Sequence, residues 1–168
     1  MSHSDSLEAF PVISEITVLW ADEDSFAHVN NVAYLRWCET GRVEYLRRLG
    51  LFPELPPKGV GPIIASVTCH YRRQLKYPDT VLVGTRVTAI GNSSFHMEHR
   101  IVSKASGETA AESEATMVTV DYSIGKPVRV PYMLCDPQSC ATQLVVNEAY
   151  VNSLKKGSKL ILTAKNRK

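Results

Sequence analysis

A single helix-like segment followed by four strand-like segments constrains the fold of this chain more than any other feature. Apolar residues recur every three or four positions across residues 31–49, which predicts one long helix that ends before Gly50. The next four segments alternate apolar and polar residues and are joined by turn sequences such as GNSS and ASGE; they are residues 63–73, 80–90, 95–103 and 109–122. Because the helix must bury its apolar side on one face of an antiparallel sheet, we predict an α+β fold.

The composition fits one domain without a nucleic-acid or membrane-spanning part. The 168 residues suit a single domain, and a formal net charge of +2 is too small to indicate a nucleic-acid partner. No apolar run approaches the roughly 20 residues that cross a bilayer, and the N-terminus lacks the basic and apolar regions of a secretory signal. The four cysteines form no CxxC pair, so we expect free thiols and a cytoplasmic protein, with a mitochondrial location left open.

The chain divides into a lead-in, a domain and an extension. We predict a loose lead-in over residues 1–15, a domain over 16–131, and a C-terminal extension over 132–168 with a short helix at 144–155. Residues 51–62 are rich in proline and glycine, which predicts a loop. Histidine and cysteine show no ligand spacing, so neither a metal nor another cofactor is predicted.

An acidic loop leads into the long helix. A short strand is expected at residues 16–20, a loop at 21–30, and the helix from Asn31, which we take as its N-cap. The loop holds two carboxylates, Asp22 and Asp24. The first N–H groups of a helix have no intrahelical partner and carry partial positive charge. This order of elements therefore brings a carboxylate to a place where a carbonyl oxygen can be polarised.

The motifs of the chain resemble those of hot-dog-fold acyl-CoA thioesterases of the 4-hydroxybenzoyl-CoA thioesterase type. The most distinctive block is D-x-D…H-V-N-N-x-x-Y-L-R-W, and CHYRRQLKYPD and VDYSIGKPVRVP follow it in the expected order. The resemblance covers about residues 16–131 and implies a curved antiparallel sheet of about five strands wrapped around one long central helix. It also implies that Asp24 is the catalytic acid and that the N–H of Asn31 polarises the thioester carbonyl. Sites of this fold usually lie between subunits, which implies a homodimer or homotetramer.

Two positions depart from the pattern of that family. Many relatives have glycine before the histidine, where this chain has Ala27, at a place that can need an unusual backbone conformation. Many relatives also read Tyr-x-Arg-Pro after the second strand, where this chain has Gln74 in place of the proline. We therefore expect differences in the setting of the loop and in the nearby binding surface.

Several further residues are candidates for supporting roles. Asp22 is expected to shape the loop by accepting backbone N–H groups, and His28 to hold the loop or to orient a substrate. Glu39 is a second-choice acid, because another branch of hot-dog thioesterases carries its carboxylate on the helix; an ion pair or buried polar contact is the simpler interpretation. The basic residues that can bind the phosphates of CoA, or else form a solvated strand end, are Arg72, Arg73 and Lys76.

Three functions follow from these residues. The first is an acyl-CoA thioesterase in which Asp24 attacks the thioester or activates water. The second is a hot-dog hydratase or dehydratase of enoyl or hydroxyacyl thioesters, which would pair Asp24 with His28. The third is a module that binds acyl-CoA without turnover. The sequence does not decide the acyl group, or CoA against acyl carrier protein.

Overall fold

A computed structural model describes residues 7–50, 59–127, 133–135 and 140–142. Its main sheet is antiparallel and has the strand order β1-β3-β4-β5-β2, with the short β6 paired to β5. A separate two-stranded sheet is formed by β7 and β8. The elements are β1 (Val12–Thr17), the 3-10 helix η1 (Trp20–Asp22), α2 (Asn31–Arg48), β2 (Val60–Tyr71), β3 (Thr80–Ile90), β4 (Ser94–Ser103), β5 (Thr109–Asp121), β6 (Lys126–Pro127), β7 (Met133–Cys135) and β8 (Cys140–Thr142).

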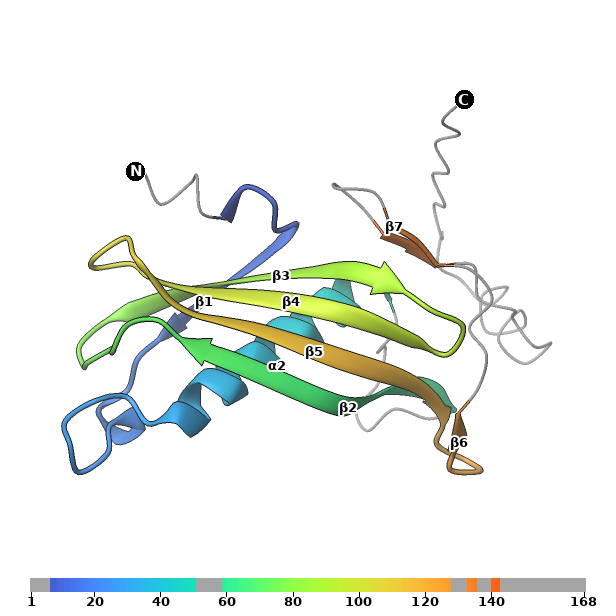
Figure 1. Ribbon diagram of the computed structural model, residues 1–168, viewed down its shortest axis with the longest axis horizontal. Coiled ribbons are helices and arrows are strands. Elements are labelled where there is room, and N and C mark those ends of the chain that lie inside the picture. The colour runs from blue at the N-terminus through green and yellow to red at the C-terminus, as the bar shows by residue number, and fades with distance from the viewer. Residues whose placement is uncertain (1–6, 51–58, 128–132, 136–139, 143–168) are drawn as a thin grey trace.

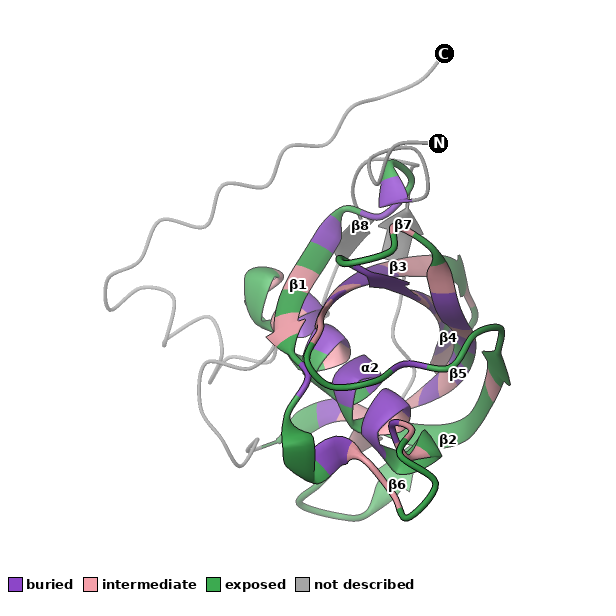
Figure 2. Cartoon of the chain, turned by 90° about the vertical axis from the view of Figure 1, so that its left-hand side faces the viewer, coloured by how far each residue is buried: buried purple, intermediate pink, exposed green. Residues whose placement is uncertain are grey.

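The main sheet curves around α2, as the two ribbon views show (Figures 1 and 2). The helix has 18 residues and lies mainly against β1 and β3. Residues on the facing sides of helix and sheet are buried, whereas β2 at the sheet edge is largely exposed (Figure 2). The predicted α+β architecture of one long helix on a curved antiparallel sheet is therefore confirmed.

The core lies between α2 and the concave face of the sheet. Trp37 and Cys38 in the middle of α2 pack with Val81 and Val83 of β3 and with Ile101 of β4. A second cluster joins the C-terminal half of the helix to β4 and β5; its buried members include Tyr45, Leu46, Phe95, Met97 and Met117. These side chains supply the apolar burial that holds an amphipathic helix on a sheet.

The first strand lies earlier in the chain than predicted. β1 pairs with β3 from Val12 opposite Thr85 to Thr17 opposite Thr80, and residues 18–20 leave the sheet instead of forming a strand. The segment before β1 is also packed, because Phe10 is buried against the outer face of the sheet. The expected strand at residues 16–20 is therefore wrong by several residues. Both Ile16 and Val12 carry β-branched side chains, and only the register with β3 distinguishes the two placements.

The edge strand β2 also departs from the predicted pattern. It begins at Val60, so the last residues of the expected loop belong to a strand, and Pro62 is tolerated there because β2 lies at the edge. The register with β5 shifts between Ile64 and Ser66, which breaks the predicted alternation from residue 63 onward. Residues 51–58 and the helix predicted at 144–155 lie outside the described residues.

Candidate active site

Polar contacts hold the acidic loop against α2 and against the segment after β2. Asp22 is buried, and its Oδ2 accepts the N–H of Leu19 at 2.8 Å, which confirms the expected loop-shaping role. Its Oδ1 forms an ion pair with Arg36 one and a half turns into α2. Glu23 accepts the N–H of Tyr77 at 2.9 Å, so the loop is held against the segment after β2 as well. The position of the loop is therefore set by contacts on two sides.

The helix is capped by Asn30 and not by Asn31, one residue earlier than predicted. The side chain of Asn30 accepts the N–H of Val32 at 2.9 Å, and its carbonyl accepts the N–H of Ala33 at 2.9 Å. Asn31 is the first helical residue, so its N–H has no intrahelical acceptor. None of the hydrogen bonds within residues 7–50 and 59–127 uses this N–H. The cap thus leaves one helix-start donor uncommitted.

Asp24 and Asn31 line the same open cavity of about 340 Å³. The Oδ1 of Asp24 accepts the N–H of Phe26 at 2.8 Å, and the N–H of Asp24 donates to the carbonyl of His28 at 2.9 Å. These bonds fix the loop. The second carboxylate oxygen of Asp24, Oδ2, has no hydrogen-bond partner among the described residues. The cavity is lined by Asp24, Val29, Asn31, Tyr34, Tyr71, Arg72, Arg73 and Gln74.

Ala27 has the unusual backbone conformation that the sequence suggested. Its φ is 56°, in the left-handed region that glycine adopts more readily than alanine. The N–H of Ala27 donates to the carbonyl of Asp24 at 3.0 Å, which closes the tight turn between them. The chain therefore keeps the turn of the D-x-D loop without a glycine, at a cost in conformational energy.

Two tyrosines form the wall of the cavity opposite the acidic loop. The rings of Tyr34 in α2 and Tyr71 at the end of β2 meet edge to face, with centroids 5.2 Å apart. The hydroxyl of Tyr71 donates to the carbonyl of Asn31 at 3.4 Å, and that of Tyr34 donates to the carbonyl of Arg73 at 3.4 Å. Burial raises the pKa of both phenols, so both remain neutral donors at physiological pH.

Of the three basic residues after β2, two line the cavity and one does not. Arg72 and Arg73 line the cavity, and each is also in an ion pair, with Glu112 at 3.0 Å and with Glu108 at 3.0 Å. Lys76 is exposed and is not part of the cavity wall. The structure therefore brings two of the three predicted basic residues to Asp24.

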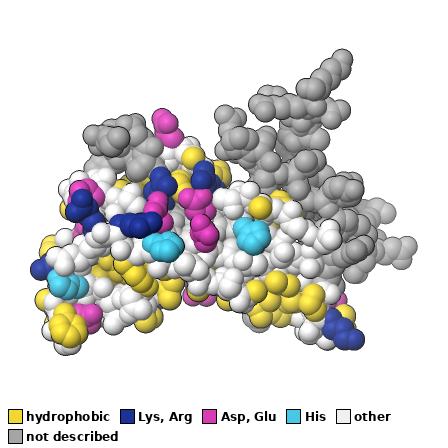
Figure 3. All heavy atoms as spheres, viewed as in Figure 1, with side chains coloured by type: hydrophobic (Ala, Val, Ile, Leu, Met, Phe, Trp, Pro, Cys, Tyr) yellow, Lys and Arg dark blue, Asp and Glu magenta, His cyan; other side chains and the backbone are white. Residues whose placement is uncertain are grey.

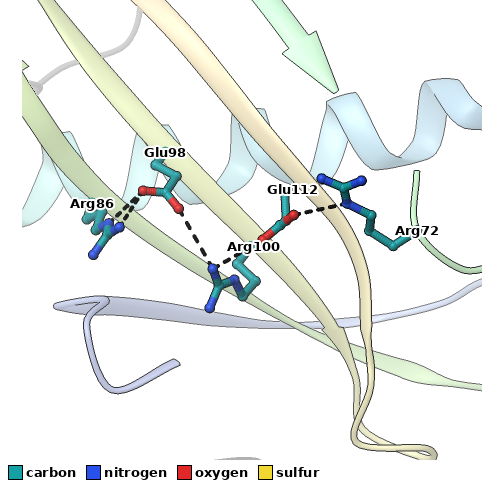
Figure 4. A network of polar contacts seen from close by, with 5 residues as sticks. All are labelled: Arg72, Arg86, Glu98, Arg100 and Glu112. Carbon is teal, nitrogen blue, oxygen red and sulfur yellow. Dashed lines mark hydrogen bonds and ion pairs between the residues drawn. The ribbon is translucent and has the colours of Figure 1, made fainter. Parts of the chain in front are cut away.

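The ion pair of Arg72 ends a longer network on the convex face of the sheet (Figure 4). Glu112 also contacts Arg100 at 3.1 Å, and Glu98 contacts Arg86 at 2.5 Å and Arg100 at 4.0 Å. Acidic and basic side chains accordingly lie next to one another on this face (Figure 3). The network crosses β3, β4 and β5 and ends at Arg72, directly after β2, so the guanidinium of Arg72 is held at the rim of the cavity.

The remaining predicted residues lie outside the cavity. Glu39 is exposed on α2 and does not line the cavity that holds Asp24 and Asn31. His28 contributes its backbone carbonyl to the loop, and its side chain does not line the cavity. Trp20 and Phe26 project from the same loop and are 75% and 80% exposed. Neither Glu39 nor the His28 ring is therefore brought to the carboxylate of Asp24.

Sequence reasoning assigns no site role to three residues of this region. In the sequence, Tyr71 and Tyr34 read only as apolar positions of a strand and a helix, and nothing singles out Arg36. Tyr34 lies three residues, about one helical turn, after Asn31, so the helical spacing in the sequence already places the two residues next to each other. Tyr71 is separated from Asn31 by 40 residues, so only the sheet order reveals their contact.

The described residues contain no group of three or more His, Cys, Asp or Glu side chains arranged to hold a metal ion. In the same part of the chain, no helix is both long and apolar enough to span a bilayer.

A long helix in a curved antiparallel sheet, with an acidic loop at the helix start, defines the hot-dog thioesterase class. The chain belongs to the thioesterase-like superfamily, whose model matches residues 18–138. A thioesterase from Thermus thermophilus, solved in complex with coenzyme A and zinc, is similar with a TM-score of 0.64 and 31% identity, over 74% of this chain and 88% of that one.

Two curated relatives are also similar. Protein THEM6 of Danio rerio is 34% identical over 118 residues, which make up 70% of this chain and 57% of that protein. The putative acyl-CoA thioesterase YneP of Bacillus subtilis is 28% identical over 116 residues, which make up 68% of this chain and 83% of that protein. The matched part of this chain thus spans little more than half the length of THEM6 and most of the length of YneP.

Proposed function

We propose that this protein is an acyl-CoA thioesterase in which Asp24 is the catalytic carboxylate and the N–H of Asn31 polarises the thioester carbonyl. The observation that carries the proposal is that Asp24 and Asn31, the first residue of α2, line one cavity. Family membership and the similarity to a putative acyl-CoA thioesterase support the same reaction.

The chemistry follows from those two groups. As the carbonyl carbon is attacked, negative charge develops on its oxygen, and a donor already aimed at that position lowers the barrier. Asp24 either attacks the carbon, forming an anhydride that water then opens, or takes a proton from a water that attacks. In both routes the C–S bond breaks, the thiolate leaves and is protonated, and the free acid is released. His28 would act only by holding the loop through its carbonyl.

The carrier end of the substrate is proposed to contact the basic residues after β2. Arg72 and Arg73 at the rim of the cavity, with Lys76 three residues further on, would meet the negative charges of CoA. A solved relative that was crystallised with coenzyme A supports a CoA ester as the first substrate to test.

We also propose that the protein works as a homodimer or homotetramer. The edge strand β2 exposes apolar side chains on both faces, including Ile63, Ile64 and Val67, and its free edge can pair with another strand. Size-exclusion chromatography with light scattering tests this directly. A monomer at micromolar concentration would contradict it. A cytoplasmic location stays a prediction from composition.

The deciding experiment is thiol release from a panel of short, long and aromatic acyl-CoAs by the wild type and Asp24→Asn. We expect turnover of at least one ester by the wild type and a loss of at least 100-fold in kcat for Asp24→Asn, with little change in Tm. Glu39→Gln is the matched control and also tests the second-choice acid, because it removes an exposed carboxylate on α2. Turnover that survives in Asp24→Asn but disappears in Glu39→Gln would overturn the assignment.

Two other outcomes would favour the rival functions. Loss of enoyl absorbance with crotonyl-CoA, without thiol release, would indicate a hydratase that pairs Asp24 with His28. Tight binding of an acyl-CoA with no turnover on any ester would indicate a module that only binds acyl-CoA.

A further inference from the structure

The ion pair between Asp22 and Arg36 joins the acidic loop to α2 and is not used by the proposed mechanism. The Asp22 side chain is 3% exposed and the Arg36 side chain is 58% exposed. A buried carboxylate is costly unless it is paired and hydrogen-bonded. Asp22 meets both conditions, because Arg36 pairs with one of its oxygens and the N–H of Leu19 donates to the other at 2.8 Å.

The same aspartate connects the loop to the helix start through its backbone. Its carbonyl accepts the N–H of Asn30 at 2.8 Å, and Asn30 is the residue that caps α2. Asp22 therefore contacts the helix at its cap by a backbone bond and in its second turn through Arg36. Asp24 follows two residues later, within about 7 Å along the chain.

We propose that Arg36 is a positioning residue for Asp24: it pairs with buried Asp22, holds the acidic loop on α2, and so fixes the place of Asp24 relative to the start of the helix. The catalytic meaning of this inference rests on the proposed function. Without Arg36, the buried Asp22 carboxylate would lose its cation, and the loop that carries Asp24 would lose its side-chain attachment to α2.

The other charged groups near Asp24 do not replace Arg36. Glu23 and His28 belong to the same loop, and Glu23 adds negative charge. Arg72 and Arg73 also line the cavity, and each is already in an ion pair with a glutamate, Glu112 and Glu108 respectively. Among the residues that the structure describes, Arg36 is thus the basic side chain that pairs with an acid of the loop.

The test compares Arg36→Met, Arg36→Lys and the double variant Asp22→Asn with Arg36→Met. The matched control is Arg47→Met, which removes an exposed arginine of the same helix that is paired with Glu44. For each protein, kcat, KM and Tm are measured. The position of the loop is followed independently by nitrogen-15 NMR, from the backbone amide signals of Asp24 and Ala27.

For Arg36→Met we expect a fall of tenfold or more in kcat with little change in KM. Arg36→Lys should restore most of kcat because it restores the ion pair with Asp22. The double variant should recover Tm, because it removes the uncompensated buried carboxylate, but should not recover kcat, because the loop is still not attached to α2. Arg47→Met should behave as the wild type.

A merely structural Arg36 would lower Tm and leave kcat unchanged, or would let kcat return together with Tm in the double variant, and either result would overturn the inference. The NMR comparison needs no turnover. If the wild type hydrolyses no thioester, the proposed function fails, whereas loop amide signals that move in Arg36→Met and in the double variant and return in Arg36→Lys still support the positioning of the loop by Arg36.

Discussion

The Oγ1 of Thr85 lies 3.0 Å from the Nδ1 of His99, and both side chains are completely buried beneath α2. They belong to neighbouring strands and face each other in the register of β3 and β4. Burial, together with the nearby positive charge of Arg42, lowers the pKa of His99 to about 3. His99 is therefore neutral in the folded protein at every pH at which the fold is normally studied.

This histidine should make stability depend on pH above the range in which carboxylates titrate. In the unfolded chain histidine takes up a proton below about pH 6.5, whereas folded His99 does not until about pH 3, so stability falls as the pH drops through this interval. Urea denaturation between pH 7.5 and 5 should show a slope approaching about 1.4 kcal/mol per pH unit. His99→Gln should remove that slope, and the exposed control His96→Gln should keep it. Equal slopes in the wild type and His99→Gln would contradict the prediction.

Gly41 lets α2 approach the same buried pair. A Cβ at this position would lie 2.4 Å from the Oγ1 of Thr85 and 3.3 Å from a methyl group of Val83, so the helix cannot stay where it is. Gly41→Ala should lower the free energy of unfolding by about 2 kcal/mol, despite the roughly 1 kcal/mol that alanine gains in helix propensity. Thermal unfolding is the measurement. Thr40→Ala, an exposed neighbour, is the control and should not reduce Tm, so equal losses in both variants would refute the close-packing argument.

Ala27 offers a gain in stability at the candidate site. A residue with a Cβ pays roughly 1–2 kcal/mol to adopt the left-handed backbone conformation, and glycine avoids this cost. Part of the advantage is lost because glycine has more conformational freedom in the unfolded chain. Ala27→Gly should therefore raise the free energy of unfolding by about 0.5–1 kcal/mol in chemical denaturation. Ala105→Gly, at an exposed alanine without positive φ, should lower it instead. A destabilised Ala27→Gly would show that the loop gains nothing from glycine.

Tyr71 should influence turnover more than stability. Its hydroxyl contacts the carbonyl of Asn31, whose N–H is proposed to polarise the substrate, but at 3.4 Å the bond is long and weak. Tyr71→Phe should lower kcat about 2–10-fold and change Tm little. Tyr122→Phe is the matched control, because the Tyr122 hydroxyl donates to the carbonyl of Pro62 at 2.9 Å, far from the cavity. The same loss of kcat in both variants would mean that the hydroxyl of Tyr71 has no special role.

The helix can be predicted from the sequence to within one residue at each end. Its apolar spacing and Gly50, which has a φ of 71°, are local signals. The predicted cap lies one residue too late because Asn30 and Asn31 are equally good cap residues by type, and only the hydrogen bond to Val32 separates them. The predicted first strand is misplaced for a related reason, since its position depends on pairing with a strand more than 60 residues away.

The candidate site shows the same division between local and long-range information. Asp24 and Asn31 are seven residues apart, so a loop leading into a helix brings them together by chain connectivity alone. Tyr71, Arg72 and Arg73 reach the cavity only because β2 ends beside the start of α2, and the sheet order that causes this has no local signature. The shift of register in β2 likewise follows from its pairing with β5.

The two tryptophans at the ends of the acidic motif provide a built-in optical readout. Trp20 is 75% exposed in η1, before Asp24, and Trp37 is 2% exposed on the buried side of α2. Indole emits at longer wavelength in water than in an apolar interior, so the two signals differ in colour and in access to a soluble quencher. A ligand that covers the loop should shield only the long-wavelength component, whereas unfolding should alter both. Trp20→Phe separates the two components, and the protein then reports occupancy of its site without an added label.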